Sequence, residues 1–189
     1  WSSDVCSSDL LFFPDLEDKA PLHAKARAIT QSVIPVLVRD MRVRYQRGLL
    51  AWLKETANPD GLKRMRDVLD GMHQLATQMP PPRGLWWAAV TLTDSAIELL
   101  PQAQSAEWLP RVKTAFSRLD FLLRDLAAGG KVDTLPAQRD VYYAIATCRT
   151  PTPQLTDACH LLNIDRLVSQ GASDNGASGN QPQIDGAKA

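Results

Sequence analysis

The sequence lacks the features that mark membrane-spanning, secreted and nucleic-acid-binding proteins. None of its apolar runs approaches the roughly 20 residues that a helix needs to cross a bilayer, and no signal peptide is recognisable. Lys plus Arg and Asp plus Glu both total 21, so the net charge is zero. That balance argues against general affinity for nucleic acid or an anionic membrane. The 189 residues are enough for one domain with a hydrophobic core.

Cysteine is also scarce. Cys6, Cys148 and Cys159 show neither paired spacing nor the spacing of metal ligands. A reducing cytoplasm is the simplest setting, and we expect the protein to be cytoplasmic. We predict no catalytic residue, no cofactor and no metal site.

The two ends of the sequence do not fit a folded domain. Residues 1–10 have no amphipathic period, and four of the ten are serine. They resemble a translated sequencing-adaptor remnant, so we expect them to be non-native and the chain to be a fragment of a longer protein. Residues 169–189 are rich in Gly, Ser, Asn and Gln without an apolar period, which predicts a disordered linker or tail.

Residues 11–35 are expected to form a strap and a first helix. Leu11–Leu16 is apolar but contains Pro14, so it cannot be a helix interior and is expected to lie extended against a helix surface. Leu22–Val33 could form one helix, with Pro35 opening the next. A single helix bent at Pro35 fits as well.

A helix predicted from about Val36 to Thr56 is expected to organise the fold, because an apolar residue recurs there every four positions. That stripe consists of Leu37, Met41, Tyr45, Leu49 and Leu53, with Trp52 beside the last. Gly48 interrupts it and costs about 1 kcal/mol relative to alanine. We expect a close approach of another helix, under a tryptophan ring, to offset that cost.

Further helices follow at intervals marked by proline and glycine. The predicted starts or spans are Asn58-Pro59-Asp60, Gly84–Leu100, a start between Ser105 and Pro110, Pro136–Cys148 and Thr152–His160. Gly129-Gly130 ends the helix that begins near Pro110, and residues 161–168 are expected to pack back onto the bundle. The predicted inward faces are Leu62, Met65, Val68, Leu69, Met72, Leu75 and Met79; Trp86, Ala89, Val90, Ile97 and Leu100; Trp108, Val112, Ala115, Phe116, Leu119, Leu122, Leu123 and Leu126; and Val141, Tyr142 and Ile145. No strand alternation is present, so the predicted fold is an all-α antiparallel bundle of five to six helices.

The tryptophans are the first candidates for a binding site. Trp52, Trp86, Trp87 and Trp108 could form a ligand box, but their places on helical stripes favour core packing. Adjacent Trp86 and Trp87 point about 100° apart on a helix, so one of them is expected to be partly exposed. That residue is the predicted interaction surface.

Other clusters favour ordinary structural roles. Arg39, Arg42, Arg44 and Arg47 spread around their helix, which indicates a solvated face rather than an anion site. Cys159-His160 lacks the third group of a nucleophile–base system. Asp67 and Asp70 are better interpreted as solvated than as metal ligands.

Three segments, in order, carry a resemblance to a known family. They are Leu11–Leu16, Tyr45–Leu53 and Leu85-Trp86-Trp87. Together they resemble the N-terminal region of ChpA-type chemosensory histidine kinases and the related FimL scaffold of type IV pilus systems. The resemblance covers roughly residues 11–168, with residues 36–168 as the FimL-like helical domain. It implies a non-catalytic scaffold, with protein partners in a chemosensory or pilus signalling complex that controls twitching motility through a phosphorelay.

True phosphotransfer domains of that family carry a histidine followed by lysine three positions later and then glycine. Here the third position after His23 is Ala26, after His73 it is Ala76, and after His160 it is Asn163. None matches, so no phosphoacceptor is carried over. Three interpretations stay open: a fragment of a ChpA-like hybrid kinase, a stand-alone FimL-like scaffold, and a phosphotransfer domain with an unorthodox histidine, of which His73 is the least implausible.

Overall fold

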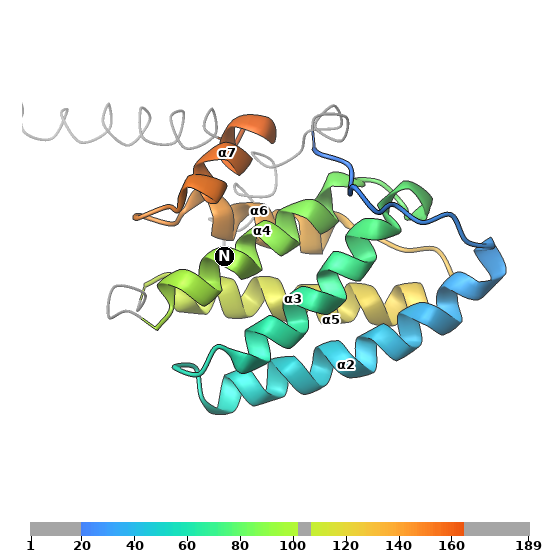
Figure 1. Ribbon diagram of the computed structural model, residues 1–189, viewed down its shortest axis with the longest axis horizontal. Coiled ribbons are helices and arrows are strands. Elements are labelled where there is room, and N and C mark those ends of the chain that lie inside the picture. The colour runs from blue at the N-terminus through green and yellow to red at the C-terminus, as the bar shows by residue number, and fades with distance from the viewer. Residues whose placement is uncertain (1–19, 102–106, 165–189) are drawn as a thin grey trace, which may run out of the picture.

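The computed structural model describes residues 20–101 and 107–164, and within them every regular element is helical (Figure 1). The all-α prediction is therefore confirmed. The α-helices are α2 (Ile34–Lys54), α3 (Asp60–Gln74), α4 (Gly84–Leu99), α5 (Leu109–Ala128), α6 (Leu135–Ala146) and α7 (Pro153–Leu161), and short 3-10 turns cover Gln31–Val33 and Ala76–Gln78.

Neighbouring helices close into a bundle. The α2 helix packs between α3 and α5, and α4 packs against α3, α6 and α7, while α6 also contacts α5. Going along α2, Arg42 meets Asp120 of α5, and Trp52 further on meets Phe116, which precedes Asp120. The two helices are therefore antiparallel.

Local signals set three of the helix ends where the sequence predicted them. The Asn58 Oδ1 accepts a hydrogen bond from the Asp60 N–H at 3.0 Å just before α3. At α7 the Thr152 hydroxyl accepts from the Leu155 N–H at 3.2 Å. Gly129 takes the left-handed conformation, φ 76°, and ends α5.

The most enclosed helix is α4 rather than α2. Its middle is buried nearly all round because small side chains let neighbours approach from several sides. These residues include Ala88, Ala89, Thr93, Ser95 and Ala96. The helix expected to organise the fold, α2, instead contacts α3 and α5 and lies at the edge of the bundle (Figure 1).

The buried stripe of α2 also differs from the predicted one. Its buried residues are Ile34, Val38, Met41, Tyr45, Gly48, Leu49 and Trp52. Leu37 is only half-buried and Leu53 is 40% exposed. A strict four-residue spacing advances by about 40° per step on a helix of 3.6 residues per turn, so it cannot stay on one face over four steps. The predicted inward faces over Leu62–Met79 and Trp108–Leu126 are buried, although α3 itself already ends at Gln74.

Residues 20–30 form an extended strap, so the predicted helix over Leu22–Val33 is wrong, as is one helix bent at Pro35. Apart from a turn at His23–Ala26, the strap bonds to α3 and to the 3-10 turn after it. The Arg27 N–H donates to the Gln74 carbonyl at 3.0 Å, and the Ile29 N–H to the Gln78 Oε1 at 3.0 Å. The expected strap at 11–16, the remnant at 1–10 and the tail at 169–189 lie outside the described residues.

The expected close helix approach at Gly48 is confirmed. A Cβ added there would lie 2.7 Å from the Gly61 carbonyl oxygen, and one added at Gly61 would lie 2.8 Å from the Trp52 Cβ. The neighbour of Gly48 is thus the backbone of α3 and not a tryptophan ring. Two glycines facing each other let α2 and α3 cross closely enough for Trp52 to be fully buried.

Candidate interaction surfaces and the histidine cluster

A histidine cluster fastens the strap to α3. The His23 Nδ1 accepts from the Lys25 N–H at 2.9 Å, which leaves Nε2 as the protonated nitrogen that donates to the Asp70 Oδ1 at 2.9 Å. The Gln74 amide donates to the other carboxylate oxygen of Asp70 at 3.2 Å. Both Asp70 oxygens therefore accept hydrogen bonds in this cluster. We call the contacts of His23, Asp70 and Gln74 the strap clasp.

His73 lies beneath this clasp. It is 8% exposed, and its Nδ1 is buried without a hydrogen-bond partner among the described residues. Burial lowers its pKa, and the neighbouring His23 lowers it further, while Asp70 opposes the shift. The ring is therefore neutral at pH 7 and packs as part of the core.

This geometry does not suit a phosphoacceptor. An acceptor histidine has to enter another protein's active site, and a cation beside it has to stabilise the phosphoryl charge. His73 is almost enclosed, and the carboxylate of Asp70 that acts on its pKa would repel a phosphoryl group. His23 uses both ring nitrogens in the clasp.

Trp52, Trp86 and Trp108 are core residues, as expected. Trp52 is fully buried and meets Phe116 edge to face with ring centroids 5.6 Å apart. Trp86 is 2% exposed, and the Trp108 indole N–H donates to the Ala144 carbonyl at 2.7 Å. Trp87 is half-buried, which confirms that one of the adjacent pair is partly exposed.

The arginines of α2 do not converge, so no anion site forms. One of them departs from the predicted solvated face. The Arg42 guanidinium donates to both carboxylate oxygens of Asp120, at 3.2 and 3.3 Å, and thereby joins α2 to α5. Asp120 is 9% exposed. Burial, and next the charge of Asp120, raise the pKa of Tyr45, whose hydroxyl donates to the Phe116 carbonyl at 2.8 Å.

The remaining candidates stay apart. Cys159 is half-buried and His160 is exposed on α7, where adjacent residues point in different directions. Asp67 is exposed, whereas Asp70 is held by the clasp. Within residues 20–101 and 107–164 no group of three or more His, Cys, Asp or Glu side chains could hold a metal ion.

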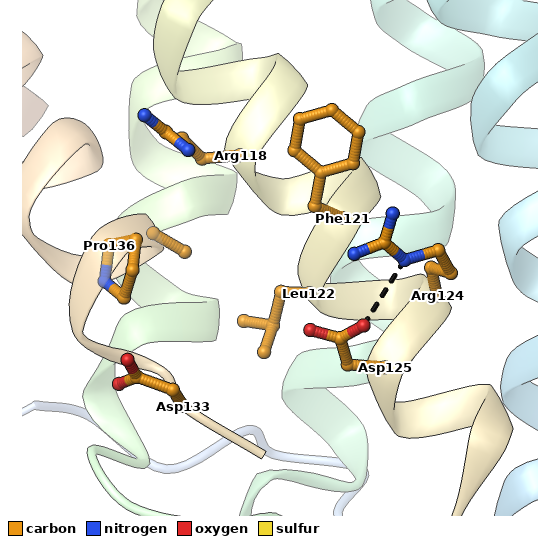
Figure 2. A pocket seen from close by; sticks show the side chains of 8 residues that line it. Arg118, Phe121, Leu122, Arg124, Asp125, Asp133 and Pro136 are labelled. Atoms are coloured by element: carbon orange, nitrogen blue, oxygen red, sulfur yellow. Dashed lines mark hydrogen bonds and ion pairs between the residues drawn. The ribbon is translucent and has the colours of Figure 1, made fainter.

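A groove lies on the surface between α5 and α6 (Figure 2). It has a volume of about 300 Å³. Its lining consists of Arg118, Phe121, Leu122, Arg124, Asp125, Asp133, Pro136 and Ala137. Phe121 stands at its rim, 45% exposed, with the Arg124 guanidinium 5.1 Å from the ring centroid. Leu122 and Ala137 provide a buried floor.

Both arginines at the groove are already paired with carboxylates. The Arg124 Nε donates to the Asp125 Oδ1 at 3.1 Å (Figure 2), and the Arg118 Nε donates to Asp140 at 2.9 Å. An apolar floor with a rim of mixed charge is typical of a protein contact rather than a small-molecule site. Another hollow, of about 200 Å³, lies where the strap crosses α2 and α3.

Sequence reasoning missed Phe121 and the strap clasp. Phe121 could have been found, because it is the one large aromatic residue off the apolar stripe of an otherwise regular amphipathic helix. The clasp had no such signal, since His23 and Asp70 are 47 residues apart.

Comparison with known families gives a match to a scaffold protein domain. The model for the second domain of the FimL scaffold protein matches residues 30–175. No curated protein and no solved structure matches the sequence. In the described part of the chain no helix is long and apolar enough to cross a membrane. Because the family model covers well over half of the sequence, the chain belongs to the family of FimL scaffold protein second domains.

Proposed function

We propose that this domain is a non-catalytic interaction module of a signalling complex that controls type IV pili and twitching motility. Membership of the FimL scaffold family carries the proposal. The parent protein would be a ChpA-like hybrid chemotaxis histidine kinase in a phosphorelay, or a stand-alone FimL-like scaffold, in either case cytoplasmic. The full reading frame separates these two parents, since only the kinase continues into kinase and receiver domains.

The histidine cluster supports a role without chemistry. His23, Asp70 and Gln74 bond to each other and fasten the strap, and the His73 ring, whose Nδ1 has no partner among the described residues, is enclosed. These contacts hold residues 20–30 against α3 and involve no reacting group.

The groove between α5 and α6 is the proposed contact surface. Phe121 offers a partly exposed aromatic ring, the type of residue that anchors many protein interfaces. Trp87, the surface predicted from the sequence, packs mainly against the core and offers less area.

Gene replacement tests the proposal. Deleting the codons for residues 30–164 from the parent gene should abolish twitching zones on agar. Changing His23 and His73 together to glutamine should leave twitching intact, provided that immunoblotting shows normal protein levels. Phe121→Ser should impair twitching, and Tyr143→Ser, which alters a similarly exposed ring on α6, should not. Normal twitching of the deletion strain would contradict the link to pili, and loss of twitching in the histidine variant would contradict the non-catalytic role.

A further inference from the structure

The α2 helix turns a second apolar face away from the bundle. Val36, Val43 and Leu50 are 62%, 44% and 59% exposed. They are spaced seven residues apart, so they form one nearly straight line along the helix. That line lies opposite the face that buries Tyr45 and Trp52. Since α2 is at the edge of the bundle (Figure 1), the described residues leave this face uncovered.

Two opposite charges lie on the same side of this line. Asp40 and Arg47 are both exposed, and they come shortly before and after Val43. The only ion pair that Asp40 makes among the described residues is with Arg44 at 3.4 Å. Both side chains of that pair are more than half exposed, so it contributes little stability. Arg47 forms no ion pair within the described part of the chain.

We propose that this face of α2 binds the same face of a second copy of the chain, with the two helices antiparallel around a two-fold axis at Val43. In that register Val43 meets Val43 of the second copy, and Val36 meets Leu50. This two-fold axis reverses the helix direction, but residues on one side of the line of contact stay on that side in both copies. Asp40 therefore faces Arg47 of the second copy, and the contact occurs twice.

Self-complementarity points to a second copy as the occupant. In the antiparallel register centred on Val43, every apolar residue of the line meets an apolar residue, and Asp40 meets Arg47. An isologous interface requires such self-complementarity. A partner of another sequence would have to supply this pattern independently. The helix of 21 residues is about 31 Å long. One helix pair buries less than the roughly 1,600 Å² of a typical stable interface. The dimer should therefore dissociate on dilution.

Sedimentation velocity over a dilution series of the full chain tests the proposal. The measured mass should rise from 20.8 kDa towards twice that value with concentration. Val43→Asp places two carboxylates against each other at the axis, so the mass should stay at that of one chain. Leu135→Asp, which alters an exposed leucine on α6, is the matched control and should dimerise normally. Circular dichroism checks that both variants keep their helix content.

A charge swap tests the antiparallel register. Asp40→Arg and Arg47→Asp each bring like charges together and should weaken association about tenfold, which corresponds to about 1.4 kcal/mol. The double variant restores both contacts and should dimerise within about threefold of the unaltered chain. A single-chain mass at the highest concentration would contradict the dimer and leave this face to a different partner. A double variant no better than the single ones would contradict the proposed register.

Discussion

The imidazoles of His23 and His73 meet edge to face, with ring centroids 5.2 Å apart and planes at 73°. The two rings belong to different elements and have different roles. His23 comes from the strap and hydrogen-bonds to Asp70, while His73 comes from α3 and lies in the interior. The strap thereby encloses the histidine that would be the least implausible phosphoacceptor.

Acid should destabilise the fold through His73. Its folded-state pKa is below the usual 6.5, so the unfolded chain binds more protons as the pH falls past 6.5. The contribution of neutral His73 to the free energy of unfolding is fully present above pH 6.5. It declines as the pH falls from there to the folded-state pKa. Urea unfolding near pH 7.5 and pH 5.5 measures the decline, and His73→Gln should reduce it. An undiminished decline in that variant would mean that other groups cause it.

Two replacements of Trp52 should show how much its ring volume and its indole N–H each contribute to the free energy of unfolding. Trp52→Ala removes a fully buried ring and should lower the free energy of unfolding by about 3–5 kcal/mol. Trp52→Phe should cost much less, because the lost indole N–H is buried without an acceptor among the described residues. Chemical denaturation of both variants gives the comparison. A loss below about 1 kcal/mol for Trp52→Ala would contradict the core assignment.

The glycine crossing should not tolerate a methyl group. Gly48→Ala puts a Cβ 2.7 Å from the Gly61 carbonyl oxygen, so α2 and α3 must move apart. We expect a loss of about 1–3 kcal/mol in spite of the better helix propensity of alanine. Gly130→Ala is the control, because nothing lies within 4 Å of its added Cβ. Thermal unfolding should show a lower midpoint for Gly48→Ala alone; equal midpoints would contradict the close crossing.

The pair of Arg42 and Asp120 should matter more than surface pairs. Asp120→Ala leaves the Arg42 guanidinium without its two hydrogen bonds at the α2–α5 contact and should cost about 1–3 kcal/mol. Asp125→Ala breaks the exposed pair with Arg124 and should cost under about 1 kcal/mol. Urea denaturation measures both. Similar losses would show that burial adds nothing to the first pair.

The features that depend on neighbouring residues, such as helix ends and apolar stripes, could be predicted from the sequence. The contacts between distant elements could not. Pro59 and Gly129 mark helix ends through their own backbone geometry, and the stripe of α5 follows from its period alone. The central place of α4 depends on small side chains that allow approach from several sides, which no period reveals. The strap bonds to Gln74 and Gln78 on another element, so its local helix propensity was overridden. The second, exposed stripe of α2 was hidden because Leu37 and Leu53 suggested a single stripe with a period of four.

The claim that this domain takes no phosphoryl group is tested most directly by labelling. The purified chain is incubated with an active chemosensory kinase or a phosphorylated receiver and labelled ATP, and acid-labile, base-stable label on the chain is measured. The enclosed ring of His73, with Asp70 as its charged neighbour, predicts no such label. Label that disappears in His73→Gln would contradict the scaffold account and make this a working phosphotransfer domain.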